Sequence, residues 1–269
     1  MAEVSATAPA MAGVARPAEL EVRGVTKDYG GLRAVDGVSL TARPGEVLGV
    51  AGPNGAGKTT LFDVITGLSA ATDGDVLLGG VSLRRASVHA RCHRGLARTF
   101  QHPTVADTLT VFENVALGGR FGRPHQHWHG VDDDPDAHAA WLLELVGLTP
   151  EAHLRAGPLG VFDKKCVMLA SALATGPRVL LLDEPFGGLD PDEIEATLEL
   201  LQGVRDLGVA VVCIEHVMSA LVRLATRVVV MDHGSVLFEG SPREMLASQA
   251  VIDRYLGMGP AGESRLRRP

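Results

Sequence analysis

Cysteine is scarce in this chain, and the cysteines that it has are not arranged to bind metal or to pair. Cys92, Cys166 and Cys213 lie far apart and form no Cys-x-x-Cys or Cys/His ligand spacing. This pattern excludes a disulfide framework and indicates reduced thiols in a cytosolic protein. Cys166 and Cys213 stand among apolar neighbours, so we expect both to be packing residues.

Long apolar runs and an excess of basic residues are also missing. The longest candidate runs, at 179–182 and 209–214, have the length of strands, so the chain is not expected to span a membrane by itself. The formal net charge of -7 argues against a general affinity for nucleic acid or anionic lipid. Arg265, Arg267 and Arg268 form a small basic tail, which we interpret as solvated.

The N-terminus lacks the features of a secretory signal. Residues 1–18 are rich in Ala and Pro, without a basic start or a clean apolar stretch, and we expect them to form a disordered tail. Residues 258–269 are expected to form a C-terminal tail. The part between them, 19–257, is long enough for one large α/β domain with a substantial core.

The most informative stretch is GPNGAGKTT, at residues 52–60. It follows an apolar run at 47–51 and precedes apolar residues at helical spacing, namely Leu61, Val64, Ile65 and Leu68. A strand, a glycine turn and a helix start in this order predict a phosphate-binding loop, whose amides and helix dipole face the phosphates. The residues expected to bind nucleotide are Gly52, Pro53, Asn54, Gly55, Ala56, Gly57, Lys58, Thr59 and Thr60. Lys58 is expected to reach the terminal phosphates, and Thr59 to ligate magnesium.

A second motif, RVLLLDEP at 178–185, is an apolar strand that ends in two carboxylates. Asp183 is placed to hold Mg²⁺ through water, and Glu184 to orient and deprotonate a water for attack on the γ-phosphate. Alone, the motif could be only a capped strand end. Together with the phosphate loop it predicts hydrolysis of a nucleoside triphosphate.

The hydrophobic pattern predicts an α/β fold. Antiparallel strands are expected at 20–29, 34–42 and 74–80. Helices dominate from about 89 to 160, notably at 111–117 and 137–146. Afterwards, strands expected at 179–182, 209–214 and 227–231 alternate with helices at 193–207 and 217–225, as in a parallel sheet. We therefore expect a P-loop NTPase core with a mainly parallel sheet, an N-terminal antiparallel β layer, and an inserted helical subdomain at about 89–165.

The whole pattern, over about 20–257, resembles the ATP-binding cassette ATPases. In that family an aromatic residue before the phosphate loop stacks on adenine, and Tyr29 lies at the matching place. Gln101, in ARTFQ, matches the glutamine that senses magnesium and the membrane partner. His216, in CIEHVM, matches the switch histidine at the γ-phosphate, and GGLD at 187–190 matches a loop that crosses the dimer interface. Taken singly, these could be an ordinary strand aromatic, a surface amide and a rim histidine; the shared order of the motifs favours the resemblance.

The resemblance implies an ATPase that drives transmembrane transport, with ATP and Mg²⁺ as cofactors. Its catalytic residues would be Glu184, His216 and Gln101, and its magnesium ligands Thr59, Gln101 and Asp183. ARTFQH, the IEH run and the ending VIDRYLG further resemble ATPase subunits of branched-chain or hydrophobic amino acid uptake, although urea or other amide importers could share these strings.

The partners implied are transmembrane permease subunits and, indirectly, an external solute-binding protein, with no nucleic acid. The protein would lie peripherally at the cytoplasmic face of the cell membrane.

The family's signature loop, LSGGQ, is degenerate in this chain. Its positions are occupied by Leu159, Gly160, Val161, Phe162 and Asp163, of which only the leucine matches. LGGR at 117–120 lies too early to replace it. Gly160 removes a hydroxyl donor, and the next two side chains occupy places where a partner's nucleotide needs close backbone approach.

We therefore expect an asymmetric heterodimer with a different ATPase subunit. The alternatives are repair of the loop by local rearrangement, an inactive relic, and a nucleotide-binding regulatory subunit with little turnover.

Two other functions are weaker. The alternating histidines of HQHWHGVDDDPDAH, at 125–138, could bind a metal, but such a stretch is more often a surface loop. A GTPase or kinase is disfavoured because no NKxD-like base-reading motif or acceptor lid is evident.

Overall fold

The computed structural model describes residues 18–122 and 134–256. The expected tails at 1–18 and 258–269, with the basic Arg265, Arg267 and Arg268, lie outside these ranges except for Ala18. Ala18 is a correction to the expected tail, because it is buried and packs with the first strands of the domain.

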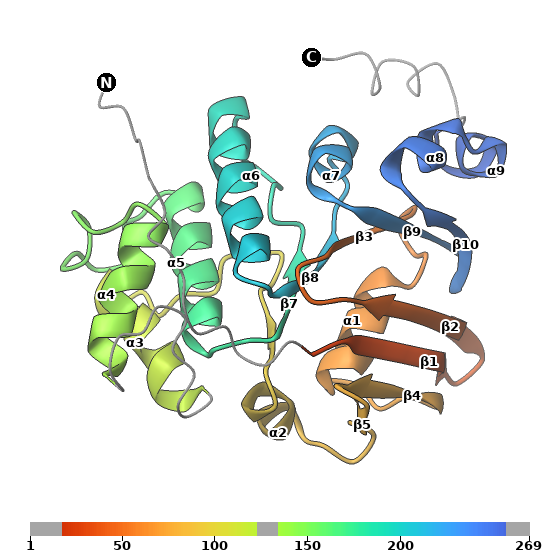
Figure 1. The fold of residues 1–269 in the computed structure, drawn as a ribbon, viewed down its shortest axis with the longest axis horizontal. Coiled ribbons are helices and arrows are strands. Elements are labelled where there is room, and N and C mark those ends of the chain that lie inside the picture. The colour runs from red at the N-terminus through yellow and green to blue at the C-terminus, as the bar shows by residue number, and fades with distance from the viewer. Residues whose placement is uncertain (1–17, 123–133, 257–269) are drawn as a thin grey trace.

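Two sheets organise the described part of the chain (Figure 1). The smaller, antiparallel sheet has the order β2-β1-β4-β5. Its strands are β1 (Leu20–Tyr29), β2 (Leu32–Ala42), β4 (Asp73–Leu78) and β5 (Val81–Ser82). The larger sheet has the order β10-β9-β3-β8-β7-β6. Its strands are β3 (Val47–Ala51), β6 (Leu96–Arg98), β7 (Val179–Asp183), β8 (Ala210–Ile214), β9 (Arg227–Asp232) and β10 (Ser235–Gly240).

All pairs in the larger sheet are parallel except that of β10 with β9. Strands β3, β7 and β8 are fully buried along their length, as continuous apolar runs in a parallel sheet should be. The predicted α/β class, with a mainly parallel sheet and an N-terminal antiparallel layer, is confirmed.

Helix α1 (Lys58–Thr66) lies between the two sheets. Its buried Leu61, Phe62 and Ile65 pack in one cluster with residues of both sheets. Leu68 was expected to continue this apolar face, and that expectation is wrong. Gly67 ends the helix in a left-handed conformation, and Leu68 beyond it is 54% exposed.

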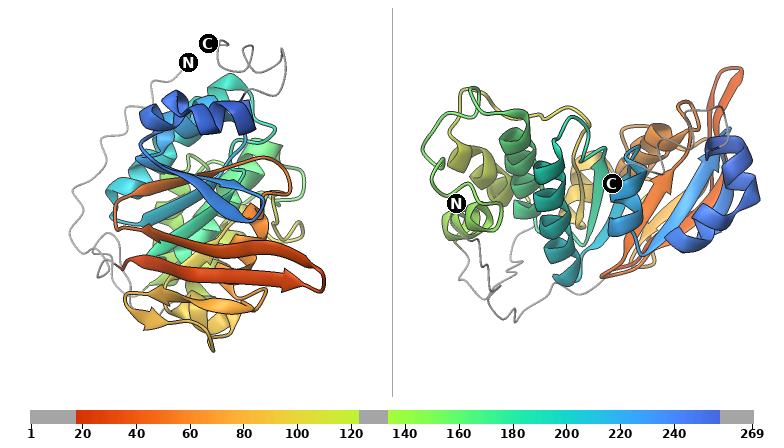
Figure 2. Two further views of the ribbon diagram at one scale, coloured as in Figure 1. Left: turned by 90° about the vertical axis from the view of Figure 1, so that its right-hand side faces the viewer. Right: turned by 90° about the horizontal axis from the view of Figure 1, so that it is seen from above.

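The other face of the larger sheet is covered by helices, as the two views of Figure 2 show. The helices between β5 and β7 are α2 (Val88–His93), α3 (Val111–Phe121), α4 (Pro135–Leu145) and α5 (Val161–Ala174). Helices α3, α4 and α5 pack on one another and form the helical part that the sequence predicted. The expected range of about 89–165 did not anticipate strand β6, which adds an edge strand to the parallel sheet, nor the continuation of α5 to Ala174.

The C-terminal third alternates strands with helices α6 (Pro191–Asp206) and α7 (Met218–Leu224). After β10 follow α8 (Pro242–Ala247), α9 (Gln249–Val251) and a π-helical turn at Ile252–Leu256. Within the described residues, no helix combines the length and apolar character needed to cross a bilayer. Cys166 and Cys213 are buried and unpaired, as predicted for packing residues.

Candidate functional site

The glycine-rich loop lies between β3 and α1, at the carboxyl edge of the parallel sheet. Two of its glycines are required by space as well as by conformation. Gly52 has φ 143°, and a Cβ there would lie 2.2 Å from the Met231 carbonyl oxygen. Gly57 has φ 97°, and its Cβ would lie 2.2 Å from the Ala34 carbonyl oxygen. Side chains at these positions would push the loop out of its conformation.

Lys58 is the first residue of helix α1, and its side chain bonds back to the start of the loop. Its Nζ donates to the carbonyl oxygens of Gly52, at 2.8 Å, and Pro53, at 2.9 Å. Burial lowers the pKa of Lys58, and the negative charges of Glu184 and Asp183 oppose this. No acidic residue lies in the first turn of α1, so the amides and the dipole at this helix end are available to an anion.

A cavity of about 550 Å³ opens above the loop. It brings together the predicted loop residues from Asn54 to Thr60, Gln101, Glu184 and His216. Its complete lining is Leu32, Arg33, Ala34, Asn54, Gly55, Ala56, Gly57, Lys58, Thr59, Thr60, Gln101, Glu184, His216, His233 and Gly234. Arg33, at the start of β2, and His233, in the β9–β10 turn, were not predicted, because no sequence motif marks either one.

Strand order explains why residues distant in sequence meet here. Strands β8, β7 and β6 are adjacent, and their carboxyl ends lead to His216, Glu184 and Gln101. Strand β3 lies next to β8 and leads into the phosphate loop. Parallel strands place their carboxyl ends at one edge, where ligands of open α/β sheets bind.

Glu184 is the centre of a polar cluster. Gln101 Nε2 lies 2.6 Å from Glu184 Oε2, and His216 Nε2 lies 3.0 Å from Glu184 Oε1. Burial lowers the pKa of His216, and the charge of Lys58 lowers it further, although Glu184 and Asp183 oppose this shift. The net depression favours the neutral imidazole, which would donate its Nε2 proton to the carboxylate.

Asp183 is buried at the end of β7, beside the cavity rather than in its described lining. Its Oδ2 accepts from Arg98, at 2.8 Å, and Arg98 also pairs with Asp63 of α1, at 2.6 Å. Arg98 therefore links the phosphate-loop helix to the second motif. Sequence reasoning quoted it within ARTFQ but gave it no role.

The predicted magnesium ligands offer only oxygen donors: the Thr59 hydroxyl, the Gln101 amide oxygen and the Asp183 carboxylate. Such hard donors suit Mg²⁺, which usually completes its shell with water and phosphate oxygens. Thr59 and Gln101 line the same cavity, and Asp183 ends the neighbouring strand. The residues present therefore fit this ion.

Tyr29 lies outside the described lining of the cavity. Its hydroxyl lies 3.3 Å from Ser69 Oγ, its ring centre is 4.6 Å from Lys27 Nζ, and the residue is 48% exposed. The assignment of Tyr29 to adenine stacking thus stays a prediction, and Leu32 is the large apolar residue at the cavity.

The degenerate segment 159–163 forms the start of α5. Gly160 is the N-cap and provides no side-chain cap, Val161 is 53% exposed, and Phe162 packs partly against the core. Burial raises the pKa of Asp163, and Glu151 and Glu193 raise it further. Among the residues that the structure describes, none of this segment lines the cavity above the phosphate loop.

The GGLD segment, 187–190, leads directly into α6. Asp190 caps this helix through a reciprocal capping box with Glu193, in which each backbone amide donates to the other's carboxylate at 2.9 Å. The role at a dimer interface that the resemblance implies for this segment stays a prediction.

Of the histidine-rich stretch, residues 125–133 lie outside the described part of the chain, and its proposed metal binding stays untested. His138 belongs to helix α4. No cluster of His, Cys, Asp and Glu able to hold a metal occurs among the residues described.

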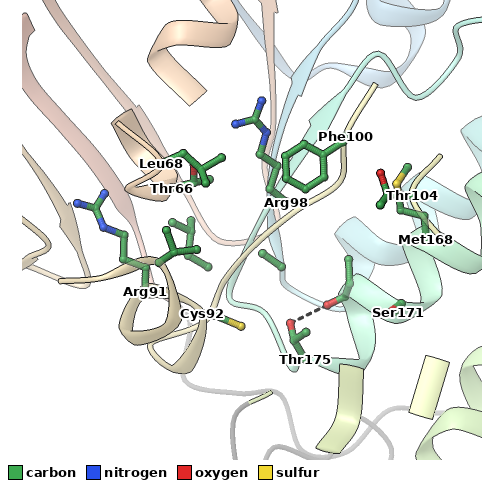
Figure 3. A pocket seen from close by; sticks show the side chains of 14 residues that line it. Thr66, Leu68, Arg91, Cys92, Arg98, Phe100, Thr104, Met168, Ser171 and Thr175 are labelled. Carbon is green, nitrogen blue, oxygen red and sulfur yellow. Dashed lines mark hydrogen bonds between the residues drawn. The ribbon is translucent and has the colours of Figure 1, made fainter. Parts of the chain in front are cut away.

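A second cavity, of about 350 Å³, lies between α2, β6 and α5 (Figure 3). Its lining is largely apolar and includes Leu68, Val88, Phe100 and Met168. Leu68, Val88 and Phe100 are between 43% and 54% exposed. We refer to this second cavity as the groove. It borders Gln101, because Phe100, which lines the groove, directly precedes Gln101 in the chain.

Comparison with known proteins identifies the arrangement. Residues 35–187 match the family model described as ABC transporter. The matched part includes the phosphate loop, Gln101 and Glu184, and ends before His216.

Relatives match over most of the chain. The high-affinity branched-chain amino acid transport ATP-binding protein BraF of Pseudomonas aeruginosa is 34% identical, over 88% of this chain and 97% of its own length. Its counterpart LivG of Escherichia coli strain K12 is 33% identical, with the same coverage. The sulfate/thiosulfate import ATP-binding protein CysA of Bordetella parapertussis is 39% identical, over 91% of this chain and 68% of its own length.

Solved structures agree with the fold. A nucleotide-free ATP-binding cassette from an ABC transporter aligns with TM-score 0.79 and 27% identity, over 89% of this chain and 99% of its own. The ADP conformation of MJ1267, an ATP-binding cassette of an ABC transporter, aligns with TM-score 0.80 and 28% identity, with the same coverage. The expected P-loop NTPase core is thereby confirmed.

Proposed function

The chain belongs to the ABC transporter family, whose ATP-binding domains are ATPases coupled to transport, and from this premise we propose that it is the ATP-binding and ATP-hydrolysing subunit of an importer. The proposed solutes are branched-chain amino acids or related small polar molecules. The observation that carries the proposed chemistry is the convergence of Gln101, Glu184 and His216 above the phosphate loop.

ATP binds first through its phosphates. The loop amides and the start of α1 face the phosphate chain, and Lys58 exchanges the carbonyls of Gly52 and Pro53 for phosphate oxygens. Two hydrogen bonds from the ammonium group to neutral carbonyls are thus replaced by bonds to negatively charged oxygens, which are stronger. Thr59, Gln101 and Asp183 would hold Mg²⁺, which when bound neutralises charge on the phosphates.

Hydrolysis follows at Glu184. Its carboxylate accepts a proton from the attacking water, and Gln101 and His216 fix its orientation from either side. Once nucleotide is bound, neutral His216 is placed to donate from Nε2 to the γ-phosphate instead of to Glu184. The Lys58 charge stabilises the negative charge of the transition state.

The proposed solute class rests on how completely each relative is matched rather than on identity. CysA has the higher identity, but the match leaves about a third of its length uncovered, whereas BraF and LivG match along 97% of theirs.

The groove of Figure 3 is proposed to receive a permease subunit. It is apolar, partly exposed, and borders Gln101, so an inserted segment would contact the loop that reports on the nucleotide. Binding there would hold the protein peripherally at the cytoplasmic face of the membrane. An external solute-binding protein would act only through the permeases.

The second ATPase of the complex is proposed to be a different subunit. Exposed Val161 and half-buried Phe162 stand at the start of α5, which would face the partner's nucleotide, while this chain's own cavity keeps Lys58, Glu184 and His216. The same two residues support an alternative, a nucleotide-binding regulatory subunit with little turnover.

Glu184→Gln tests the proposed function. We expect phosphate release from the assembled transporter to fall by about 10²- to 10⁴-fold, because a general base is lost, while ATP affinity is kept. Filter binding of ATP and a phosphate-release assay measure the two effects. Glu195→Gln, an exposed carboxylate change on α6, is the control. If Glu184→Gln left the hydrolysis rate of the complex unchanged, the regulatory alternative would be favoured.

A further inference from the structure

Glu184 has an unusual backbone for a residue with a side chain. Its φ is 51°, in the left-handed region, where a non-glycine residue is strained and persists only when its surroundings determine it. It begins a turn with Pro185 and Phe186 as the chain leaves β7. Two backbone bonds join this turn to its neighbours: Glu184 N donates to Ile214 O at 2.9 Å, and Gly187 N donates to Glu184 O at 3.2 Å.

Lys165, in the second helical turn of α5, binds carbonyl oxygens of the 184–186 turn. Its Nζ donates to the carbonyl oxygen of Glu184, at 2.9 Å, and to that of Pro185, at 3.0 Å. Burial lowers the pKa of Lys165, and the charges of Glu215 and Glu184 oppose this. Its amine thus reaches the backbone of the base without contacting the base's carboxylate in any recorded bond.

Glu215, which follows β8, holds the amide side. Only 1% of it is exposed. Its Oε1 accepts from Phe186 N, at 3.2 Å, and its Oε2 accepts from His216 N, at 2.8 Å. One carboxylate therefore joins the turn that carries Glu184 to the backbone of His216.

We propose that Lys165 and Glu215 are positioning residues for hydrolysis, which fix the 184–186 turn from its carbonyl and amide sides and so aim Glu184 and His216 at each other. The proposal rests on the proposed role of Glu184. It also means that α5 contacts the backbone of the base directly, through Lys165, which lies two residues beyond the segment 159–163. Displacement of α5 would move the carbonyls of Glu184 and Pro185.

Neither residue lines the described cavity above the phosphate loop, so neither is placed to bind ATP. A positioning role therefore predicts a loss of hydrolysis without a loss of affinity. A misplacement of about 1 Å in an active site can cost about 100-fold in rate.

The test measures single-turnover ATP hydrolysis and ATP affinity in the assembled transporter. Lys165→Met and Glu215→Gln are each expected to slow hydrolysis by about 10- to 100-fold and to change the ATP dissociation constant by less than about 2-fold. Lys165→Arg, which keeps donors for two carbonyls, is expected to recover most of the rate. Lys164→Met is the matched control, because Lys164 is the adjacent lysine and pairs only with exposed Asp107 in the described structure.

Combination with Glu184→Gln distinguishes positioning from a general structural role. In that background, Lys165→Met is expected to reduce the residual rate no further, since it acts through the base. An equal additional reduction would overturn the proposal, as would wild-type rates in both Lys165→Met and Glu215→Gln. If Glu184→Gln alone leaves hydrolysis intact, the proposed base is wrong and the positioning proposal falls with it.

Discussion

Burial of charged groups is the main physical feature of the site at the scale of single residues. Lys58, Asp183 and Glu215 are each less than 9% exposed, and each has a stated partner: two carbonyls, an arginine and two amides. Buried charge is costly unless such partners satisfy it. These partners hold the three side chains in place, and in the proposed mechanism nucleotide binding exchanges the contacts of Lys58 with its carbonyls and of His216 with Glu184.

Glu215 should make the stability of the protein depend on pH. Burial raises its pKa to about 7, while the amides of His216 and Phe186 oppose this. Between the unfolded value of about 4.3 and the folded value, the folded state binds one proton more than the unfolded state. The free energy of unfolding should consequently fall as pH rises through this window, by up to about 1.4 kcal/mol per pH unit from this group.

Urea unfolding at several pH values between 5 and 8 measures this dependence. Glu215→Gln cannot titrate, so its stability relative to wild type should increase with pH and level off above about pH 7. Glu239→Gln, an exposed carboxylate change, should leave the slope as it is. Parallel pH profiles for wild type and Glu215→Gln would contradict the assignment.

At the scale of elements, the N-terminus of each helix indicates whether its free amides are satisfied by a side chain or are available to a ligand. Among the described helices of nine residues or more, α3, α4 and α6 begin with a side-chain cap. In helices α1 and α5 the N-cap residue is a glycine, and no side chain caps the helix. Uncapped amides are what a phosphate group can bind. The first of these two starts lies at the chain's own nucleotide cavity, and the second is the proposed contact with the partner's nucleotide.

Restoring the loop at the start of α5 should raise turnover at the partner's site. The double change Gly160→Ser with Phe162→Gly adds a hydroxyl donor and removes the bulky side chain; one oxyanion donor is worth about 10²- to 10³-fold in rate. The measurement uses a complex in which this chain also carries Glu184→Gln, so that only the partner's site can hydrolyse ATP. We expect the double change to raise the hydrolysis rate of that complex. The double variant should also melt at lower temperature, because Phe162 packs partly on the core.

Gly160→Ser alone serves as the comparison, since it adds the donor without relieving the steric obstruction. Little gain is expected from it. Fast hydrolysis by this chain as a homodimer, without any change to the loop, would contradict the asymmetric model.

At the scale of the whole molecule, the nucleotide cavity and the groove are lined by different elements. The segment with Arg98, Phe100 and Gln101 joins the two. Arg98 pairs with Asp183 and Asp63, and its guanidinium lies 5.0 Å from the Phe100 ring centre. A permease segment in the groove would thus be connected to both motifs of the site.

Val88→Asp tests the groove without touching the nucleotide cavity. Val88 is 44% exposed and lines the groove, so a charge there should weaken permease binding and abolish permease-stimulated hydrolysis while ATP affinity stays the same. Val81→Asp is the matched control, because Val81 is 55% exposed on β5, away from the described lining. Co-purification with the permeases and stimulated ATPase rates give the readout, and equal behaviour of the two variants would reject the docking proposal.

The sequence alone determined the features that depend on local chemistry. Glycines with a following Lys58 specify the phosphate loop, and apolar runs of strand length specify the buried parallel strands, because both signals are contained in a few consecutive residues. The motif that ends in Glu184 is also local, whereas Gln101 and His216 were assigned from the resemblance to the ATP-binding cassette ATPases.

Which side chains meet depends on the order of the strands and the packing of the helices. Strand order brings Gln101, Glu184 and His216 into contact across more than a hundred residues of chain, and it places Lys165 and Glu215 behind the strained turn. The roles of Arg98 and Glu215 and the short strand β6 could not be read from local pattern. Their stabilisation comes from partners far away in the sequence, and such partners are fixed only when the sheet has formed.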